Sequence, residues 1–302
     1  MIKLKAWLNA ARLRTLPLSI SGILVGVSLA QFYGYFNWII FLLAILTTVG
    51  FQVTSNFAND YGDGVKGTDG DERIGPKRAL QSGILSRKEL KNGIIISILI
   101  DFILVIALLY FSFGGEKLNL IFIFLLLAIA SIWAAIKYTV GDNAYGYKGL
   151  GDIFVFLFFG LLGVLGSMYL FTSYLTLSSI FPAITIGCLS TGVLNLNNLR
   201  DSIPDKKAGK NTLVVKMGYE KGKIYHYTLL AVSFICMLTF TLINFKFWFN
   251  FLHLVIFIPI FLNAKMVEKT KNPVLLDPEL KKLALCTFFL AILFYISFNI
   301  FS

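Results

Sequence analysis

The chain has 302 residues, a mean hydropathy of +0.77 and only 14% charged residues. A soluble globular domain carries about 25% charged residues, so this composition excludes an ordinary soluble protein. The net charge of +11 could indicate nucleic-acid binding, but the positions of the cations along the chain point to a membrane instead.

Nine apolar runs, most of them about 20 residues long, predict membrane-spanning helices. They lie near residues 15–34, 36–56, 92–113, 119–138, 150–171, 174–198, 224–244, 247–267 and 281–301. Lipid leaves backbone groups no water to bind, so helices are expected, and the alternating segments of a β-barrel are not seen. The first run follows basic residues, as a signal peptide does, but the eight later runs favour a retained helix. The predicted fold class is an all-α integral membrane protein with nine transmembrane helices.

The basic residues are sorted by membrane side. Of the 27 Lys and Arg residues, all except Lys117 and Lys246 fall at the amino terminus or in the connections after spans two, four, six and eight. With nine spans these segments share one side of the membrane. The positive-inside rule then predicts a multi-pass cell (inner) membrane protein with its amino terminus in the cytoplasm and its carboxyl terminus outside. No nucleic-acid partner is expected, and no obligate protein partner is evident.

Isolated reactive residues inside the spans give weaker signals. Cys188, Cys236 and Cys286 lie in apolar runs without a CxxC pair, and they are expected to be small buried side chains. Asp101 lies within the third span, where an acidic residue suggests a function, but the sequence offers it no partner.

Two long connections, residues 57–91 and 199–223, carry charges of both signs. Each begins at an Asn-rich helix end, continues with spaced aspartates and then turns basic. They lie about 140 residues, or four helices, apart, which is typical of an internal repeat. This pattern predicts two four-helix halves plus a ninth helix, arranged as one domain over residues 1–302.

The first connection gathers the acidic residues that the rest of the chain lacks. Only 16 acids occur in all, and five of them lie between Asp60 and Glu72. Asn59 and Asp63 are four residues apart and would share one face of a helix, with Asp60 beside them and Asp69 further on. Carboxylates this close repel one another near a membrane unless a cation neutralises them. Oxygen ligands without His or Cys favour Mg²⁺ or Ca²⁺.

The second connection repeats this chemistry with Asp201 and Asp205, again four residues apart. Mg²⁺ is usually bound by one or two carboxylates together with substrate phosphates, so two facing half-sites would hold a diphosphate through metal ions. Basic residues able to contact phosphate oxygens follow both clusters: Lys66, Arg73, Lys77 and Arg78 in the first connection, and Lys206, Lys207 and Lys210 in the second.

A charged loop between spans is more often only solvated, with basic residues that set orientation. For one loop that explanation would be preferred, but two such loops in equivalent places favour a binding site for metal ions and a diphosphate. The first loop lacks the ligand spacing of an EF-hand, and no GxxxxGK[ST] of a P-loop occurs.

At these residues the chain resembles the UbiA superfamily of intramembrane prenyltransferases, and most closely its 1,4-dihydroxy-2-naphthoate polyprenyltransferase branch. The matching segments are "RTLPLSISG", "SNFANDYGDGVKGTD", "GPKRALQSG", "YTVGDNAYGYKGLGDIFVFLFFG" and "NNLRDSIPDKKAGKNTL". The superfamily motif NxxxDxxxD is matched by Asn59 and Asp63, but Gly67 takes the third position and Asp69 resembles its replacement. The second motif, DxxxD, is matched by Asp201 and Asp205.

The resemblance implies nine helices around a central cavity, with both Asp loops at the cytoplasmic face. It implies Mg²⁺ bound by Asn59, Asp60, Asp63, Asp69, Asp201 and Asp205, and catalytic roles for Asp63, Asp201, Asp205 and Lys148. It also implies diphosphate contacts at Arg78, Lys210, Tyr138 and Arg14, to which the charge pattern adds Lys66, Arg73 and Lys77. The implied reaction joins the chain of a polyprenyl diphosphate to 1,4-dihydroxy-2-naphthoate, with loss of CO₂, inside a membrane lipid environment.

Two alternatives stay open at this point. The acceptor could be another aromatic compound, such as homogentisate or 4-hydroxybenzoate. The chain could also be an ion-coupled transporter, which would likewise have internal repeats and intramembrane acids. A transporter places its polar groups near the bilayer midplane, whereas most charge here falls at helix ends.

Overall fold

The computed structural model describes residues 2–67 and 78–300. Within these ranges nine helical segments are long and apolar enough to cross a membrane, which confirms the predicted number of spans. No strand occurs in the same residues. In chain order the elements are α1 (Ile2–Ala11), η1 (Leu13–Thr15), α2 (Leu16–Phe32), α3 (Trp38–Lys66), α4 (Arg87–Phe113), α5 (Leu118–Lys137), η2 (Tyr145–Lys148), α6 (Gly151–Val155), η3 (Phe156–Gly166), α7 (Ser167–Thr172), η4 (Leu177–Ser179), α8 (Ile180–Arg200), α9 (Ser202–Lys207), α10 (Leu213–Met217), α11 (Tyr219–Ile243), η5 (Trp248–Ile256), α12 (Phe257–Lys269), η6 (Pro273–Leu276) and α13 (Asp277–Asn299).

Local sequence signals set the ends of the helices that carry the charged loops. The side chain of Asn37 caps α3 by accepting hydrogen bonds from the backbone N–H groups of Ile39 and Ile40. At the other end, Gly67 terminates α3 with φ of +71°, a left-handed conformation that glycine adopts without strain. α4 begins with a capping box between Ser86 and Glu89. The polar end of α3 is therefore a regular helix, which fixes the relative positions of its side chains.

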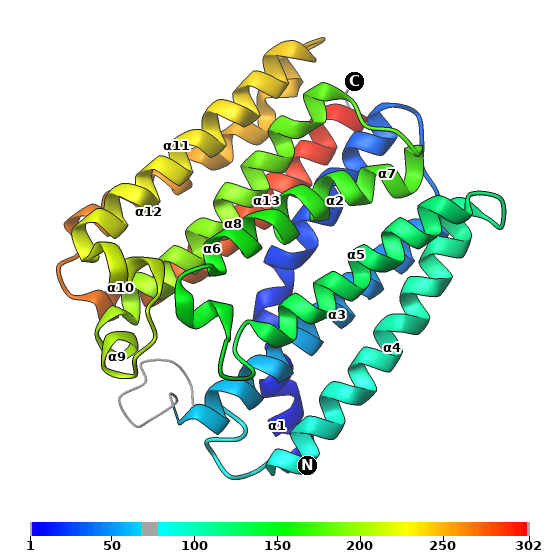
Figure 1. Ribbon diagram of the computed structural model, residues 1–302. Helices are drawn as coiled ribbons and strands as arrows, with labels where there is room; N and C mark the ends of the chain where they lie inside the picture. The colour runs from blue at the N-terminus through cyan, green and yellow to red at the C-terminus, as the bar shows by residue number, and fades with distance from the viewer. Residues whose placement is uncertain (1, 68–77, 301–302) are drawn as a thin grey trace.

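The helices form two packed groups (Figure 1). One group joins α3, α4 and α5, and its apolar core includes Ala44, Val105 and Ala128. The other joins α8, α11, α12 and α13 with η3. α2 contributes to both cores, and α13 lies along α2 and α8. The ninth helix thus connects the two halves instead of standing outside them.

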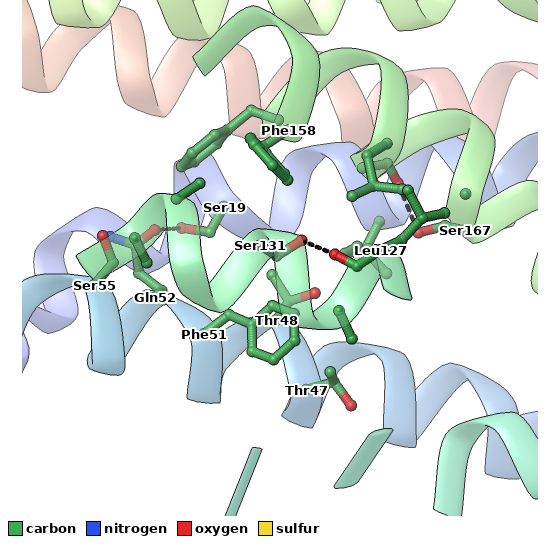
Figure 2. A pocket seen from close by; sticks show the side chains of 18 of the residues that line it. Ser19, Thr47, Thr48, Phe51, Gln52, Ser55, Leu127, Ser131, Phe158 and Ser167 are labelled. Atoms are coloured by element: carbon green, nitrogen blue, oxygen red, sulfur yellow. Dashed lines mark hydrogen bonds between the residues drawn. The ribbon is translucent and has the colours of Figure 1, made fainter. Parts of the chain in front are cut away.

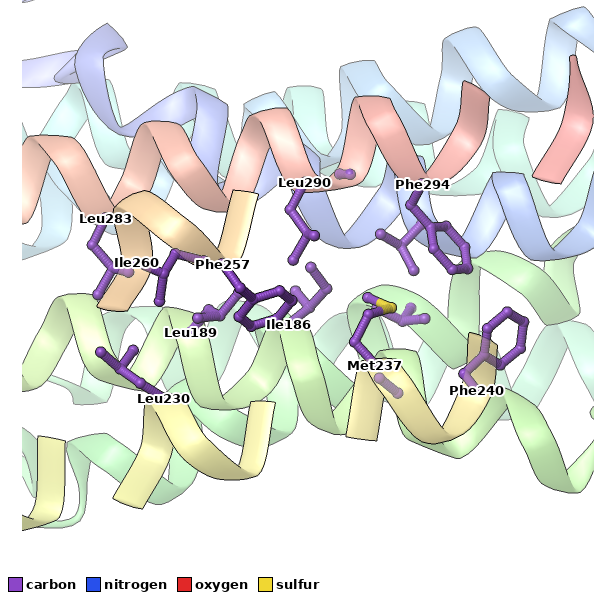
Figure 3. Close-up of a cluster of buried hydrophobic side chains, with 14 of the residues drawn as sticks. Ile186, Leu189, Leu230, Met237, Phe240, Phe257, Ile260, Leu283, Leu290 and Phe294 are labelled. Atoms are coloured by element: carbon purple, nitrogen blue, oxygen red, sulfur yellow. The ribbon is translucent and has the colours of Figure 1, made fainter. Parts of the chain in front are cut away.

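The larger core lies in the second group and is almost entirely aliphatic and aromatic. Figure 3 shows Ile186 and Leu189 of α8 beside Phe257 of α12 and Leu290 of α13. All four side chains are at most 1% exposed. Such complete burial fixes α8 along its length, including the end that carries the second aspartate motif.

Glycines allow three helices to approach closely at the boundary between the groups. A Cβ atom on Gly160 of η3 would lie 2.5 Å from Cα of Gly187 in α8. A Cβ atom on Gly26 of α2 would lie 2.4 Å from the carbonyl oxygen of Val164. Small residues at such crossings are typical of membrane helix packing. They hold α2, η3 and α8 together beside the cavity described next.

The predicted central cavity lies between the two groups and has a volume of about 380 Å³. Residues of α2, α3, α4 and α5 line one side of it, and residues of α6, η3 and α7 line the other. Asn59 and Tyr138 line one end, and apolar side chains such as Leu109 and Leu170 line the remainder.

Asp101, which the sequence left unassigned, joins α4 to α3. Its side chain is fully buried, and the hydroxyl of Thr54 donates a hydrogen bond of 2.6 Å to its Oδ2 atom. Gly50 provides the space for this contact, because a Cβ atom there would lie 2.1 Å from Oδ1 of Asp101. The structure therefore gives this acid a helix-packing contact within the first group.

We expect the Gly160→Val variant to lose stability, by about 1–3 kcal/mol or more, because the new side chain collides with backbone atoms of α8. Thermal unfolding in detergent should show a lower midpoint than for the wild-type protein. Gly115→Val is the matched control, since no atom lies within 4 Å of a Cβ atom at that position. Equal midpoints for the two variants would contradict the close crossing.

Candidate active site

The end of α3 brings the first motif to the mouth of the cavity. Asp63 is buried, and its carboxylate forms an ion pair of 2.5 Å with Nη1 of Arg78. The hydroxyl of Tyr147 donates a hydrogen bond of 2.7 Å to Oδ1 of Asp63. Nη1 of Arg78 also donates to the backbone carbonyl of Asn59, at 2.7 Å. Asp63 of the first motif and Arg78, a basic residue that follows it in sequence, therefore meet at the mouth of the cavity.

Asn59 and Asp60 point to different neighbours. The side-chain oxygen of Asn59 accepts a hydrogen bond of 3.2 Å from Thr139, and Asn59 lines the cavity. Asp60 is buried and accepts a hydrogen bond of 3.1 Å from the backbone N–H of Ala79. Asn59 thus lies at the cavity, whereas Asp60 fixes the returning chain next to Arg78.

Asp205 of α9 supplies the second carboxylate of the site. It is buried, and its Oδ1 atom lies 3.6 Å from Nζ of Lys210. Burial raises the pKa of Asp205 to about 6, although the charge of Lys210 opposes this, and the neighbouring carboxylates of Asp201 and Asp63 raise the pKa further. Nζ of Lys210 lies 5.7 Å from the ring of Tyr147, whose hydroxyl bonds to Asp63, so the two motifs, far apart in sequence, meet at one site.

Asp201, the other acid of the second motif, is held by a residue that the sequence did not single out. Nε and Nη2 of Arg200 donate to its two carboxylate oxygens at 2.8 and 2.6 Å. Arg200 is buried, and its Nη1 atom reaches Asp277 at the start of α13, at 2.5 Å. A buried guanidinium shared by two carboxylates fixes the end of α8 against α13.

Tyr147 of η2 links the two motifs. Besides its bond to Asp63, its ring lies 3.9 Å from Nζ of Lys66 and 5.7 Å from Nζ of Lys210. Its backbone carbonyl accepts a hydrogen bond of 3.1 Å from the N–H of Asn211. One residue from the middle of the chain therefore contacts cations that follow both aspartate motifs.

The remaining predicted residues divide by position. Tyr138 lines the cavity, and burial, followed by nearby carboxylates, raises the pKa of its phenol. Lys148 is exposed, and its ammonium donates to Oδ1 of Asn143 at 2.9 Å. Arg14 is exposed in η1. Three further predicted residues lie outside the described part of the chain: Asp69, Arg73 and Lys77.

The oxygen atoms at this site suit Mg²⁺ in type. Oδ2 of Asp205 is buried and has no hydrogen-bond partner among the described residues. Such an unsatisfied carboxylate oxygen beside other acids is the kind of ligand that a hard divalent cation takes. Asn59, Asp63, Asp201 and Asp205 could hold the ion. Within residues 2–67 and 78–300, no cluster of three or more Asp, Glu, His or Cys side chains is already arranged around a metal position.

Sequence reasoning missed Tyr147, Thr139 and Arg200. Tyr147 and Arg200 directly precede residues that were singled out, Lys148 and Asp201. Their position beside these residues was the one clue in the sequence. Which of two neighbouring side chains points into the site depends on helix and loop geometry, which residue spacing alone does not reveal.

Comparison with known proteins assigns the chain to a family. The sequence model of the "UbiA prenyltransferase family" matches residues 19–293. A 1,4-dihydroxy-2-naphthoate octaprenyltransferase of Haemophilus influenzae is 44% identical over 294 residues, covering 97% of this chain and 95% of that protein. The protein of the same name in Escherichia coli is 42% identical and covers 92% of this chain and 90% of its own length.

A solved structure has the same fold. It is a UbiA homolog from Archaeoglobus fulgidus bound to DMAPP and Mg²⁺. The TM-score is 0.63 at 15% sequence identity, and the match covers 96% of this chain and 99% of that chain.

We expect the Asp205→Asn variant to be more stable than the wild-type protein in EDTA at pH 8, by on the order of 1 kcal/mol. Because the folded pKa is about 6 and the ordinary value is 3.8, the folded state binds more protons between these values. Wild-type stability therefore falls as the pH rises through this window, and the advantage of the variant should vanish near pH 4.

Thermal unfolding in detergent across pH 4–8 measures this difference. Added Mg²⁺ should stabilise the wild-type protein more than the variant, since a ligand stabilises the state that binds it. A variant less stable than the wild type at pH 8 in EDTA would show that Asp205 is instead a stabilising partner of Lys210.

Proposed function

Because the chain belongs to the UbiA prenyltransferase family, we propose that it transfers the chain of a polyprenyl diphosphate to 1,4-dihydroxy-2-naphthoate with loss of CO₂. The product is the hydroquinone demethylmenaquinol, the reduced form of demethylmenaquinone, and the pathway is menaquinone biosynthesis. The relatives of this name in Haemophilus influenzae and Escherichia coli match over 97% and 92% of the chain, so the comparison covers both aspartate motifs and nearly all of the spans.

One observation about the site carries the proposal. The carboxylates of Asp63 and Asp205 come from helix ends about 140 residues apart and lie in one electrostatic site, with Arg78 and Lys210 beside them. This site adjoins an apolar cavity within the membrane-spanning part of the chain. A ligand with a highly charged end and an apolar chain matches both parts.

The residues have distinct roles in the proposed reaction. The C–O bond between the prenyl chain and the diphosphate breaks, and its electron pair leaves with the diphosphate. Arg78 and Lys210 stabilise the charge on the departing oxygens. The apolar cavity excludes water from the allylic cation until the electron-rich ring of the acceptor forms the new C–C bond. The bond from the ring to the carboxylate then breaks, CO₂ leaves, and the electron pair of that bond restores the aromatic ring.

Mg²⁺, when bound, would supply charge neutralisation for the diphosphate. The UbiA homolog from Archaeoglobus fulgidus was solved with this ion and a prenyl diphosphate. In this chain we assign the ion to Asn59, Asp63, Asp201 and Asp205. The roles predicted for Asp60, Asp69 and Lys148 remain predictions.

We place the reaction at the cytoplasmic face of the inner membrane. The amino terminus, the end of α3 and α9 lie at the same end of the helix bundle, and the carboxyl terminus lies at the opposite end (Figure 1). The sorting of the basic residues supports a cytoplasmic position for the site and the amino terminus, by the positive-inside rule.

An assay in membranes tests the reaction. A prenyl diphosphate, Mg²⁺ and 1,4-dihydroxy-2-naphthoate should yield a product that carries the prenyl group and lacks the carboxylate, detected by mass spectrometry. EDTA should abolish its formation. Turnover of homogentisate or 4-hydroxybenzoate but not the naphthoate would assign a different aromatic acceptor.

We expect Asp63→Ala and Asp201→Ala to lower turnover by at least about a hundredfold, because each removes a carboxylate of the site. Glu220→Ala is the matched control, since this acid has a 79% exposed side chain outside the cavity and should leave activity near the wild-type level. Circular dichroism of each variant reports whether the helices have formed. Full activity in either aspartate variant would rule out the metal assignment.

A further inference from the structure

The cavity has one polar side, formed mainly by α3. Asn59, Ser55 and Gln52 occur at helical spacing on the cavity face of α3, and Ser19 of α2 lies beside Gln52 (Figure 2). Deeper in the cavity this face continues with Thr48 and becomes apolar. The polar row begins next to the carboxylate site and ends about two turns away from it.

Gln52 is held in one orientation within this row. The hydroxyl of Ser19 donates a hydrogen bond of 2.6 Å to Oε1 of Gln52, and Nε2 donates to Oδ1 of Asn56 at 3.3 Å. Asn56 is anchored in turn, because its amide donates to the backbone carbonyl of Ala11 at 2.8 Å. A carboxamide carries two N–H donors. The second donor of Gln52 has no partner among the described residues, although the side chain lines the cavity.

Aromatic side chains form another part of the cavity wall. Tyr145 stacks on Phe154 with ring centroids 3.9 Å apart, and Phe154 is parallel to Phe158 at 6.1 Å. Tyr138 meets the edge of Tyr145 at 5.4 Å. All four line the cavity with the polar row. A flat aromatic ligand would find ring faces and edges to pack against here.

The space between these walls suits one aromatic molecule. Asn59 and Gln52 are seven residues apart on α3, which corresponds to ~10 Å along the helix axis. The cavity volume of about 380 Å³ is near the lower limit for pockets that enclose a small organic ligand. A bicyclic ring and the first part of a prenyl chain would fill it.

We propose that the acceptor, 1,4-dihydroxy-2-naphthoate, binds between Asn59 and Gln52 with its rings against the aromatic wall. Its 4-hydroxyl oxygen accepts a hydrogen bond from the second N–H of Gln52. The orientation follows from charge. A carboxylate is costly inside the membrane, so that end of the acceptor turns toward Arg78 at the mouth. The hydroxyl further from the carboxylate then points to Gln52. This inference rests on the proposed function.

The acceptor and one analogue of it test the Gln52 contact in the membrane assay. 1,4-Dihydroxy-2-naphthoate has the 4-hydroxyl, and 1-hydroxy-2-naphthoate lacks it and serves as a competitive inhibitor. The wild-type protein should bind the second compound about tenfold more weakly than the first, the effect of one lost hydrogen bond. Gln52→Leu should bind both equally weakly, while its KM for prenyl diphosphate stays within about twofold of the wild-type value. An unchanged KM for that substrate also shows that the variant is folded.

Gln31→Leu is the matched control. Gln31 accepts a hydrogen bond of 2.8 Å from Tyr295 and does not line the cavity, so the same substitution there should preserve the tenfold preference. Ser19→Ala, which frees the Gln52 amide to rotate, should weaken the preference without abolishing it.

If Gln52→Leu keeps the wild-type preference, the Gln52 contact is wrong but the proposed function stands. If the wild-type protein does not turn over the naphthoate at all, both fail.

Discussion

Repulsion between buried carboxylates is the constraint on which this structure depends. Burial raises the pKa of Asp205, and the nearby carboxylates of Asp201 and Asp63 add to this effect. Arg78 and Lys210 offset part of this repulsion in the protein alone. The unsatisfied oxygen of Asp205 shows that the compensation is incomplete. A site of this kind binds multivalent cations well, and without them it lowers the stability of the folded protein.

The surrounding structure keeps these groups together. Tyr147 bonds to Asp63, and the backbone of its loop bonds to the loop that carries Lys210. Thr139 bonds to the backbone of Ala58 and to Asn59. In the bundle, the glycine contacts of η3 hold α2 and α8 close together. Because each of these contacts joins segments distant in sequence, the geometry of the site is a property of the assembled fold.

Hydropathy and charge alone predicted the nine spans and the end of the bundle at which the charged loops lie, because each signal is a sum over many residues. The sequence singled out both Asp63 and Arg78, but as a metal ligand and a phosphate contact, and it did not predict the ion pair between them. Individual side-chain directions were not predictable. The side chain of Asp60 accepts a hydrogen bond from the backbone of Ala79, and the side chain of Lys148 donates one to Asn143. A shift of one turn in a helix or loop changes which way such a side chain points. Gln52 gave no signal, as a single amide in an apolar run has no pattern.

The contact of Arg200 with both Asp201 and Asp277 has a consequence for biogenesis. Asp201 belongs to the second motif, but Asp277 opens the last span. During synthesis, eight spans can enter the membrane before Arg200 has its second carboxylate. The second motif therefore reaches its final electrostatic environment only after the ninth helix has been made and has docked against α8. An enzyme that handles a reactive allylic diphosphate is thereby completed at the last step of its own insertion.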